Sequence, residues 1–251
     1  FGFRALFDRA CKIFVFILLL LLSSEVRSQD VVYWRAEATD GNWEHGSDCN
    51  DTGSDGWWNY AAPANGFRKR PDCFQGNKIL FNNANQLAMN LNNPADFTAN
   101  QVLFETGTGD RTIGTDAGKS LYFKQNNGNA KIENLASATT HTFNVNINID
   151  AAAQMEINPV WGYLVFNNPV INASPNPILI WGNTGSSYAG DNVYFNGDIS
   201  GTAGITINQN ATVVYDVVQK TYTGPTTINS GTFLQIKSNQ TLGDVYAYGT
   251  I

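Results

Sequence analysis

The pattern of hydrophobic and polar positions between residues 191 and 244 divides this part of the chain into short strands. Apolar or alternating runs recur there, and none of them has the 3.6-residue period of an amphipathic helix. Val, Ile, Thr and Tyr fill the runs, which is typical of a pleated, half-buried surface, and Asn-Gly or Ser-Gly turns separate them. The runs are Val193–Phe195, Ile205–Ile207, Val213–Tyr215, Thr226–Ile228 and Phe233–Ile236. Strands this short and this closely spaced predict either a coil of strands or a sandwich.

The same strand-and-turn pattern extends back to Asn77 and contains near copies. The copies read KILFNN at 78–83, YLVFNN at 163–168 and VYFNG at 193–197. The separation between the starts at 163 and 193 suits one coil of three strands, and the longer separation between 78 and 163 would hold three or four coils. Asn at coil corners can hydrogen-bond to the Asn above and below it. We therefore predict a coil with Asn ladders and strands stacked at about 4.8 Å.

One segment carries a family resemblance. Residues 221–236, TYTGPTTINSGTFLQI, resemble the autotransporter-associated β-strand repeat, also called the passenger-associated transport repeat. Pro225 stands where the family often has a second Gly, and Phe233 looks like an extra residue before the strand. The resemblance covers about one copy and implies a right-handed parallel β-helix in a secreted or cell-surface passenger. The matching residues are Tyr222, Gly224, Thr226, Thr227, Ile228, Gly231, Thr232 and Leu234.

The N-terminal segment 1–28 has the organisation of a secretory signal peptide. Basic residues precede the apolar run Ile13–Leu22, which is too short to span a bilayer comfortably. Val26 and Ser28 supply small side chains at the −3 and −1 positions of a cleavage site before Gln29. The alternative is an N-terminal membrane anchor. We predict export with cleavage near Gln29, which leaves no transmembrane segment in the mature chain.

Residues 29–76 form a segment of different composition, rich in Trp, with the two cysteines of the mature chain. Export to an oxidising compartment predicts a disulfide between Cys49 and Cys73. In the chain-entropy model a loop of about 25 residues contributes about 3 kcal/mol of stability. The first rung of a β-helix exposes unpaired backbone, and such an edge needs a cover. We therefore predict that this segment is a disulfide-stapled N-terminal cap on the coil.

The cap also holds the aromatic residues that we predict as a binding surface. Trp57, Trp58 and Tyr60 lie inside the predicted disulfide loop, where Trp rings could stack on sugars or could plug the end of the core. An acidic loop starting at Asp51 resembles a cation loop, but Ala62 stands at its twelfth position, where an EF-hand has a bidentate Glu. The sequence predicts no metal site and no cofactor.

Charge and residue inventory argue against nucleic-acid binding and catalysis. The net charge is −6, and an acidic surface repels phosphate. Carboxylates are sparse after Asn77, although Asp96, Glu133, Asp150 and Glu156 could align on neighbouring coils. No Gly-x-Ser-x-Gly motif and no phosphate loop appears, and His141 is expected as a surface turn residue.

These observations predict three parts: a signal peptide at 1–28, the cap at 29–76 and β-helix repeats at 77–251. No polar closing segment follows the last strand pattern, so the repeats are expected to continue past Ile251. The predicted fold is all-β, a right-handed parallel β-helix, with an antiparallel β-sandwich as the alternative. The predicted function is a non-catalytic secreted or bacterial surface passenger, adhesin-like, with extracellular glycans or neighbouring cell surfaces as partners. The alternative is a carbohydrate-active β-helix enzyme or glycan-binding module.

Overall fold

The computed structural model describes residues 31–34, 57–59, 78–81, 88–89, 97–114, 120–125, 128–182, 192–216, 220–237 and 244–248. Over these residues the regular elements are 22 strands, β1 to β22, and there is no helix. The prediction of an all-β chain is confirmed for this part of the sequence. No helix within these ranges has the length and hydrophobicity needed to cross a bilayer.

The strands form three sheets, in each of which a strand is hydrogen-bonded to the strands named before and after it. The ten-stranded sheet consists of β2 (Trp57–Asn59), β1 (Val31–Trp34), β3 (Lys78–Phe81), β6 (Gln101–Phe104), β9 (Ala130–Asn134), β12 (Met155–Pro159), β15 (Ile178–Trp181), β18 (Ile205–Asn208), β20 (Thr226–Ile228) and β22 (Val245–Ala247). The seven-stranded sheet consists of β21 (Phe233–Ile236), β19 (Thr212–Tyr215), β16 (Asn192–Phe195), β13 (Tyr163–Phe166), β10 (Thr140–Phe143), β7 (Arg111–Ile113) and β4 (Ala88–Met89). The five-stranded sheet consists of β17 (Ile199–Gly201), β14 (Val170–Asn172), β11 (Asn146–Ile149), β8 (Ser120–Phe123) and β5 (Phe97–Ala99).

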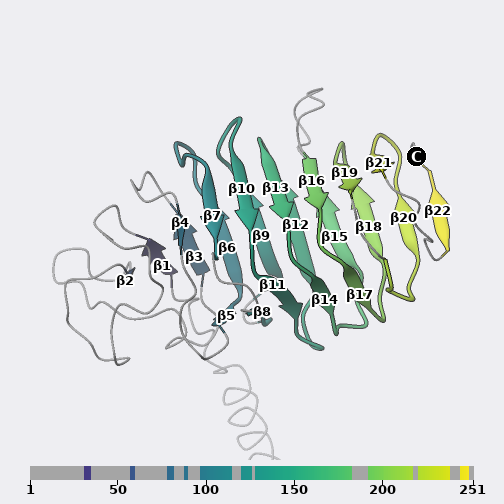
Figure 1. Cartoon of the computed structure of the whole chain (residues 1–251), viewed down its shortest axis with the longest axis horizontal. Coiled ribbons are helices and arrows are strands. Elements are labelled where there is room, and N and C mark those ends of the chain that lie inside the picture. The colour runs from purple at the N-terminus through teal and green to yellow at the C-terminus, as the bar shows by residue number, and fades with distance from the viewer. Residues whose placement is uncertain are drawn as a thin grey trace, which may run out of the picture.

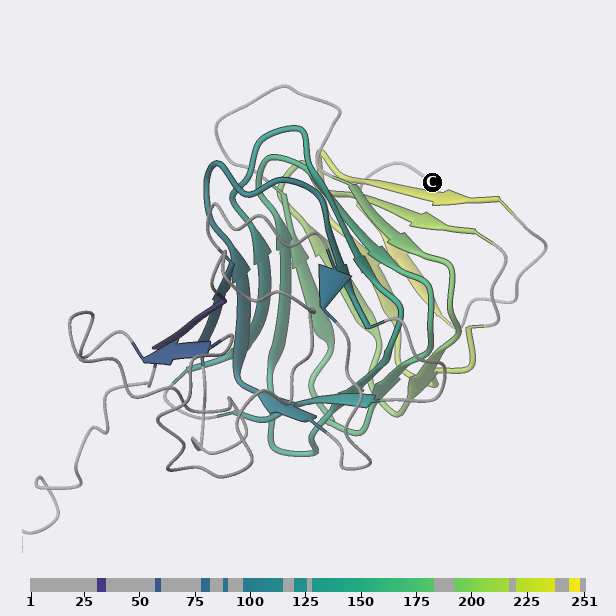
Figure 2. The same cartoon turned by 60° about the vertical axis from the view of Figure 1, so that its left-hand side comes forward.

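Chain order and pairing together make a parallel β-helix. Consecutive strands such as β3, β4 and β5 go to three different sheets, and β6 then returns beside β3. Among the strands of the structure, every pairing is parallel except the one between β1 and β2. Figure 1 shows the strands stacked along the long axis, and Figure 2 shows the coils nested one behind another. The coil prediction is confirmed, and the antiparallel sandwich is excluded.

The number of residues in one coil varies, because the corner segments between strands differ in length. Tyr163 pairs with Asn192, so the near copies that start at 163 and 193 lie on adjacent coils, one position away from the predicted alignment. Many more residues separate Gln101 from Lys131, its partner on the next coil, than separate Thr227 from its partner Tyr246. The copy at 78–83 is not equivalent to the other two, because its strand β3 lies in the ten-stranded sheet and β13 lies in the seven-stranded sheet.

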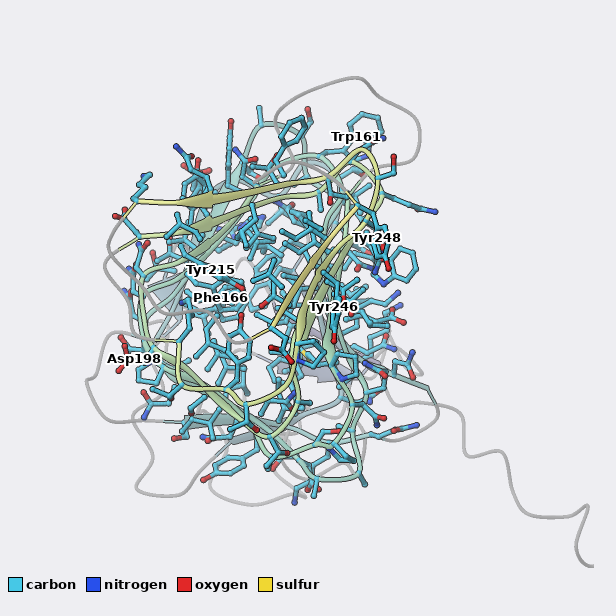
Figure 3. The ribbon with its side chains drawn as sticks, turned by 90° about the vertical axis from the view of Figure 1, so that its right-hand side faces the viewer. Trp161, Phe166, Asp198, Tyr215, Tyr246 and Tyr248 are labelled. Atoms are coloured by element: carbon cyan, nitrogen blue, oxygen red, sulfur yellow. The ribbon has the colours of Figure 1, made fainter. Side chains whose placement is uncertain are left out.

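Aromatic side chains from successive coils stack inside the helix. Phe166 lies between Phe143 and Phe195, with ring centroids 5.1 and 5.2 Å apart and near-parallel planes. Tyr215 follows on the next coil, edge-on to Phe195 at 6.0 Å. All four rings are fully buried, and Figure 3 shows Phe166 and Tyr215 inside the coil. Parallel register places equivalent positions directly over each other, and each such pair contributes about 0.5–1.5 kcal/mol beyond burial.

Asn residues form the predicted ladder at the corner after the seven-stranded sheet. The Asn167 amide donates to Asn144 Oδ1 at 2.8 Å, and the Asn196 amide donates to Asn167 Oδ1 at 2.9 Å. A second, shorter ladder links the Asn229 amide to Asn208 Oδ1 at 2.5 Å, beside the ten-stranded sheet. The role predicted for the recurrent Asn is therefore confirmed at two corners of the coil.

The segment that resembles the passenger repeat supplies strands β20 and β21. Tyr222 and Thr232 are buried, Leu234 is 1% exposed in the core, and Gly231 has a φ of 77° in the left-handed region that Gly tolerates. Phe233, expected as an extra residue before the strand, is instead the first residue of β21, pairs with Thr212 and is 50% exposed. The remaining matched residues belong to or adjoin β20. The segment is thus an ordinary rung of this coil, and its membership of the repeat family stays a prediction.

The predicted cap is described only at β1 and β2. β1 extends the ten-stranded sheet by pairing in parallel with β3, and β2 pairs antiparallel to β1. The signal peptide, Cys49, Cys73 and Tyr60 lie outside the described residues, and only the backbone is described for Trp57 and Trp58. The disulfide and the aromatic surface of the cap remain predictions.

The aromatic stack gives a direct test of the fold. Replacing Phe166 by Ala should lower the free energy of unfolding by about 3–5 kcal/mol, because it removes one ring from a stack that cannot close over the gap. The matched control is Phe233→Ala in the same sheet, which should change the free energy by no more than about 0.5 kcal/mol, because that ring is exposed. Urea unfolding followed by circular dichroism measures both. Equal losses in the two variants would contradict the assigned register.

Candidate functional site

The outer face of the ten-stranded sheet is the longest continuous surface of the coil, and register divides it into two rows. Side chains alternate along a strand, so every second residue points outward. The first row is Lys78, Gln101, Lys131, Glu156, Leu179, Thr206, Thr227 and Tyr246. The second row contains Leu80, Leu103, Glu133 and Asn158, and then Trp181 and Asn208. Asn229 and Tyr248 continue it one residue beyond β20 and β22.

The second row of this face is closed to solvent at its first coils. Leu80 and Leu103 occupy outward positions but are only 5% exposed, whereas Lys78 and Gln101 in the first row are partly exposed. Both rows are at least partly exposed from β9 onward.

The middle of the face carries a compact charged cluster. Lys131 Nζ lies 3.6 Å from Glu133 Oε1 and 3.6 Å from Glu156 Oε2. The Asn129 amide donates to Glu156 Oε1 at 2.7 Å, and the Asn158 amide donates to Glu133 Oε1 at 3.3 Å. Two of the four carboxylates considered for catalysis, Glu133 and Glu156, are thus brought together on neighbouring coils.

The other two carboxylates do not join this pair. Asp150 follows β11 of the five-stranded sheet, where its Oδ1 accepts a hydrogen bond from the Ala152 amide at 3.2 Å. Asp96 lies outside the described ranges. Among the described carboxylates, any acid–base pair on this face would therefore consist of Glu133 and Glu156 alone.

Both carboxylates of that pair are engaged by other side chains of the protein. Hydrolases place a sugar, with or without a water molecule, between two carboxyl groups that flank the bond to be cleaved. Here the ammonium group of Lys131 lies between Glu133 and Glu156, and Asn amides occupy further lone pairs. The cluster is an ion-paired clamp between adjacent coils, and pairs at such partly exposed positions contribute about 0.2–1 kcal/mol. No set of three or more His, Cys, Asp or Glu in the described part of the chain is positioned to hold a metal ion.

The coils that carry β15, β18, β20 and β22 present a different surface, which we call the Thr–Asn face. All eight of its outward residues are uncharged, and all are at least partly exposed. Two tyrosines are the most open, Tyr246 at 51% and Tyr248 at 72%, and Figure 3 shows both directed away from the coil. The Thr–Asn face consists of Leu179, Trp181, Thr206, Asn208, Thr227, Asn229, Tyr246 and Tyr248.

The polar groups in the middle of the Thr–Asn face are largely unused. The hydrogen bond from Asn229 to Asn208 fixes both amides. Asn208 Nδ2, Asn229 Oδ1 and the hydroxyls of Thr206 and Thr227 make no hydrogen bond to any described residue. The face therefore offers one amide donor, one carbonyl acceptor and two hydroxyls to a ligand.

Sequence reasoning missed this face, although its signal is visible in the chain. The strands read ILIW, ITIN, TTIN and VYAY, with Leu and Trp, Thr and Asn twice, and two Tyr at alternate positions. Each run alone reads as an ordinary half-buried strand. Only the pairing of Leu179 with Thr206, of Thr206 with Thr227 and of Thr227 with Tyr246 puts the four runs in register.

The interior also holds ionisable groups, beginning with His141. The expectation of a surface turn is wrong, because His141 is fully buried in β10 and stacks on Phe104 with ring centroids 3.7 Å apart. Its Nε2 lies 3.1 Å from Asn134 Oδ1. Burial, with a smaller effect from the charge of Arg111, lowers the pKa of His141 to about 3. The imidazole is therefore neutral near pH 7, and it acts as a structural residue.

Lys220 is another buried ionisable group. It is 8% exposed, and its Nζ lies 4.2 Å from the ring centroid of Tyr215 and 5.6 Å from that of Phe195. Nζ has no hydrogen-bond partner among the described residues. Burial lowers the pKa of Lys220 to about 7, against the opposing charge of Asp198. Aromatic contact favours the cation, but desolvation is the stronger effect here.

The shifted pKa of Lys220 predicts a pH dependence of stability. In the unfolded chain the pKa is about 10.4, so between about pH 7 and pH 10 the unfolded state binds more protons than the folded state. Stability should therefore rise with pH in this window, by about 2 kcal/mol between pH 7 and pH 9. In Lys220→Met the rise should disappear, as measured by urea unfolding at the two pH values. An unchanged rise in this variant would show that another group causes it.

Comparisons with known proteins give no match: no family model, no curated protein and no solved structure is significantly similar to this chain. Function therefore has to be inferred from the coil itself and from the two contrasting halves of its outer face.

Proposed function

We propose that the chain is a non-catalytic, adhesin-like passenger that is secreted or held at a bacterial cell surface, with the β-helix as its stalk. The main support is the fate of the acidic residues that could have carried chemistry. Glu133 and Glu156 are the carboxylates that the fold aligns, and both are ion-paired to Lys131 and hydrogen-bonded to Asn amides. A clamp of this kind joins coils and leaves no free acid–base pair for a substrate on the described part of this face.

The use of the remaining positions supports the same proposal. Most inward residues belong to the apolar core, and Asn144, Asn167 and Asn196 form a ladder at one corner. Asn is a poor acid or base, so the polar inventory suits stacking and recognition better than proton transfer. The apolar run Ile13–Leu22 and the cleavage pattern before Gln29 support export. Partners would then be extracellular glycans or the surfaces of neighbouring cells.

The alternative is a carbohydrate-active β-helix enzyme. It is favoured only by the approach of Glu133 and Glu156 on the open face. Fold analogy adds nothing to it, because one fold serves many unrelated functions.

Absence of turnover is the first test of the proposal. The mature chain should release no reducing ends and no unsaturated products from a panel of neutral and acidic polysaccharides. Glu133→Gln with Glu156→Gln should lower the free energy of unfolding by no more than about 1 kcal/mol for each ion pair lost. Robust cleavage by the parent chain that disappears in this double variant would establish the enzyme instead.

Export is the second test. Expression of the full chain in a bacterium with a secretion pathway should yield a mature protein that starts at or near Gln29. A non-reducing digest should contain a peptide pair that links Cys49 to Cys73, because export places both thiols in an oxidising compartment. Mass spectrometry measures both features. An uncleaved cytoplasmic protein with two free thiols would contradict the proposal.

A further inference from the structure

We propose that the Thr–Asn face binds a neutral glycan chain that lies along the axis of the coil. This inference rests on the proposed function and names its partner by chemistry. Four features of the face support it: its regular register, its aromatic rings, its unused hydrogen-bonding groups and its lack of charge.

The face is a regular strip of adjacent strands. Its residues come from β15, β18, β20 and β22, which are adjacent and parallel in the ten-stranded sheet. Strands in a sheet are about 4.8 Å apart, so the strip is about 14 Å long from the first strand to the last. The outward residues stand in two rows, which makes a long, narrow surface. An extended oligosaccharide fits this shape better than a small globular ligand does.

Aromatic rings lie on the first and the fourth strand of the strip. Trp181 is on β15, and Tyr248 stands in the same row three coils later, with Tyr246 beside it in the first row. Tyr and Trp combine an apolar ring with a polar tip. The C–H faces of a pyranose can pack on such rings while its hydroxyls remain free to hydrogen-bond.

Between the rings lie the unused polar groups. Asn208 Nδ2 is a donor, Asn229 Oδ1 is an acceptor, and the hydroxyls of Thr206 and Thr227 can be either. Sugar hydroxyls also donate and accept, so this mixture complements them. The ladder bond already fixes both amides, which lowers the ordering cost on binding.

Charge and size decide between glycans and other partners. None of the eight residues is charged on a chain of net charge −6, so an anionic polymer would gain nothing on the strip and would be repelled by the rest of the protein. A second copy of the chain would need about 20–30 residues from each partner for a stable interface. Eight residues, of which only Leu179 is aliphatic, are too few and too polar for that.

The test uses the mature full chain in native gels that contain dissolved polysaccharide. The neutral probes are galactomannan, xylan, mannan and a β-glucan, and the acidic probes are polygalacturonate and alginate. At least one neutral polymer should retard the protein, and added salt should not change the retardation, because no ion pair is involved. Trp181→Ala and Tyr248→Ala should each weaken the interaction about tenfold or more.

Matched variants separate binding from folding. Trp161 and Phe233 are exposed at 44% and 50% but lie outside the strip, so Trp161→Ala and Phe233→Ala should bind within about twofold of the parent chain. Thr206→Val with Thr227→Val keeps side-chain shape on the face, removes both hydroxyls and should still weaken binding. If Trp181→Ala fails to fold, as judged by circular dichroism, Trp181→Phe and the Thr pair replace it. Trp181→Phe should keep most of the affinity.

Three outcomes would overturn the inference: no retardation by any neutral polymer, retardation by acidic polymers only, or full binding by Trp181→Ala, Tyr248→Ala and the Thr pair. A dimer in sedimentation that is lost in Tyr248→Ala would instead assign the strip to a second copy of the chain. Release of products from a probe would refute the proposed function. If no polymer retards the protein and no products are released, only the glycan assignment is refuted.

Discussion

Parallel register is the constraint on which the rest of this structure depends. Each coil lies on the one before it, so a residue type that recurs at equivalent positions meets its own kind above and below. Phe143, Phe166 and Phe195 therefore become one aromatic stack, and Asn144, Asn167 and Asn196 become one amide ladder. Neither arrangement needs long-range sequence information beyond repetition. The same constraint aligns outward residues, so the coil produces its surface strips by the same rule that produces its core.

The constraint also explains where polar groups enter the core. His141 occupies the inward position next to Arg111 on the preceding coil and Leu164 on the following one, so it faces inward whatever its polarity. Asn134 and Thr139 lie within hydrogen-bonding distance of its Nε2, and Phe104 covers its ring. Lys220 likewise forms a parallel β-bridge with Ile199, which extends the five-stranded sheet by one residue. Its Nζ lies over the rings of Tyr215 and Phe195 inside the coil. Position in the coil outweighs residue preference at both sites, and the lowered pKa values are the electrostatic consequence.

The sequence predicted the fold well because alternation and Asn-rich turns are local signals. It predicted the step from YLVFNN to VYFNG to within one position, since both belong to the same sheet. It could not assign KILFNN to a sheet, because the number of residues in one coil varies with the length of its corners. The hydrophobic pattern does not show the length of a corner. The location of His141 was missed although it alternates with Phe143 in β10, because a lone His was expected at the surface. The Thr–Asn face required register as well as pattern: ITIN and TTIN are visible in the chain, but their alignment with ILIW and VYAY is not.

The two open halves of the outer face use this alignment in opposite ways. On β9 and β12 the aligned positions hold Lys131, Glu133 and Glu156, which satisfy one another across adjacent coils. On β18 and β20 the aligned positions hold Thr and Asn, and their side chains make only one hydrogen bond to a described residue. A polar group that its neighbours satisfy contributes to stability, whereas one left open to solvent contributes little to it and remains free for a ligand. The first half is therefore a clamp between coils, and the second half is the part of the stalk that is suited to recognition.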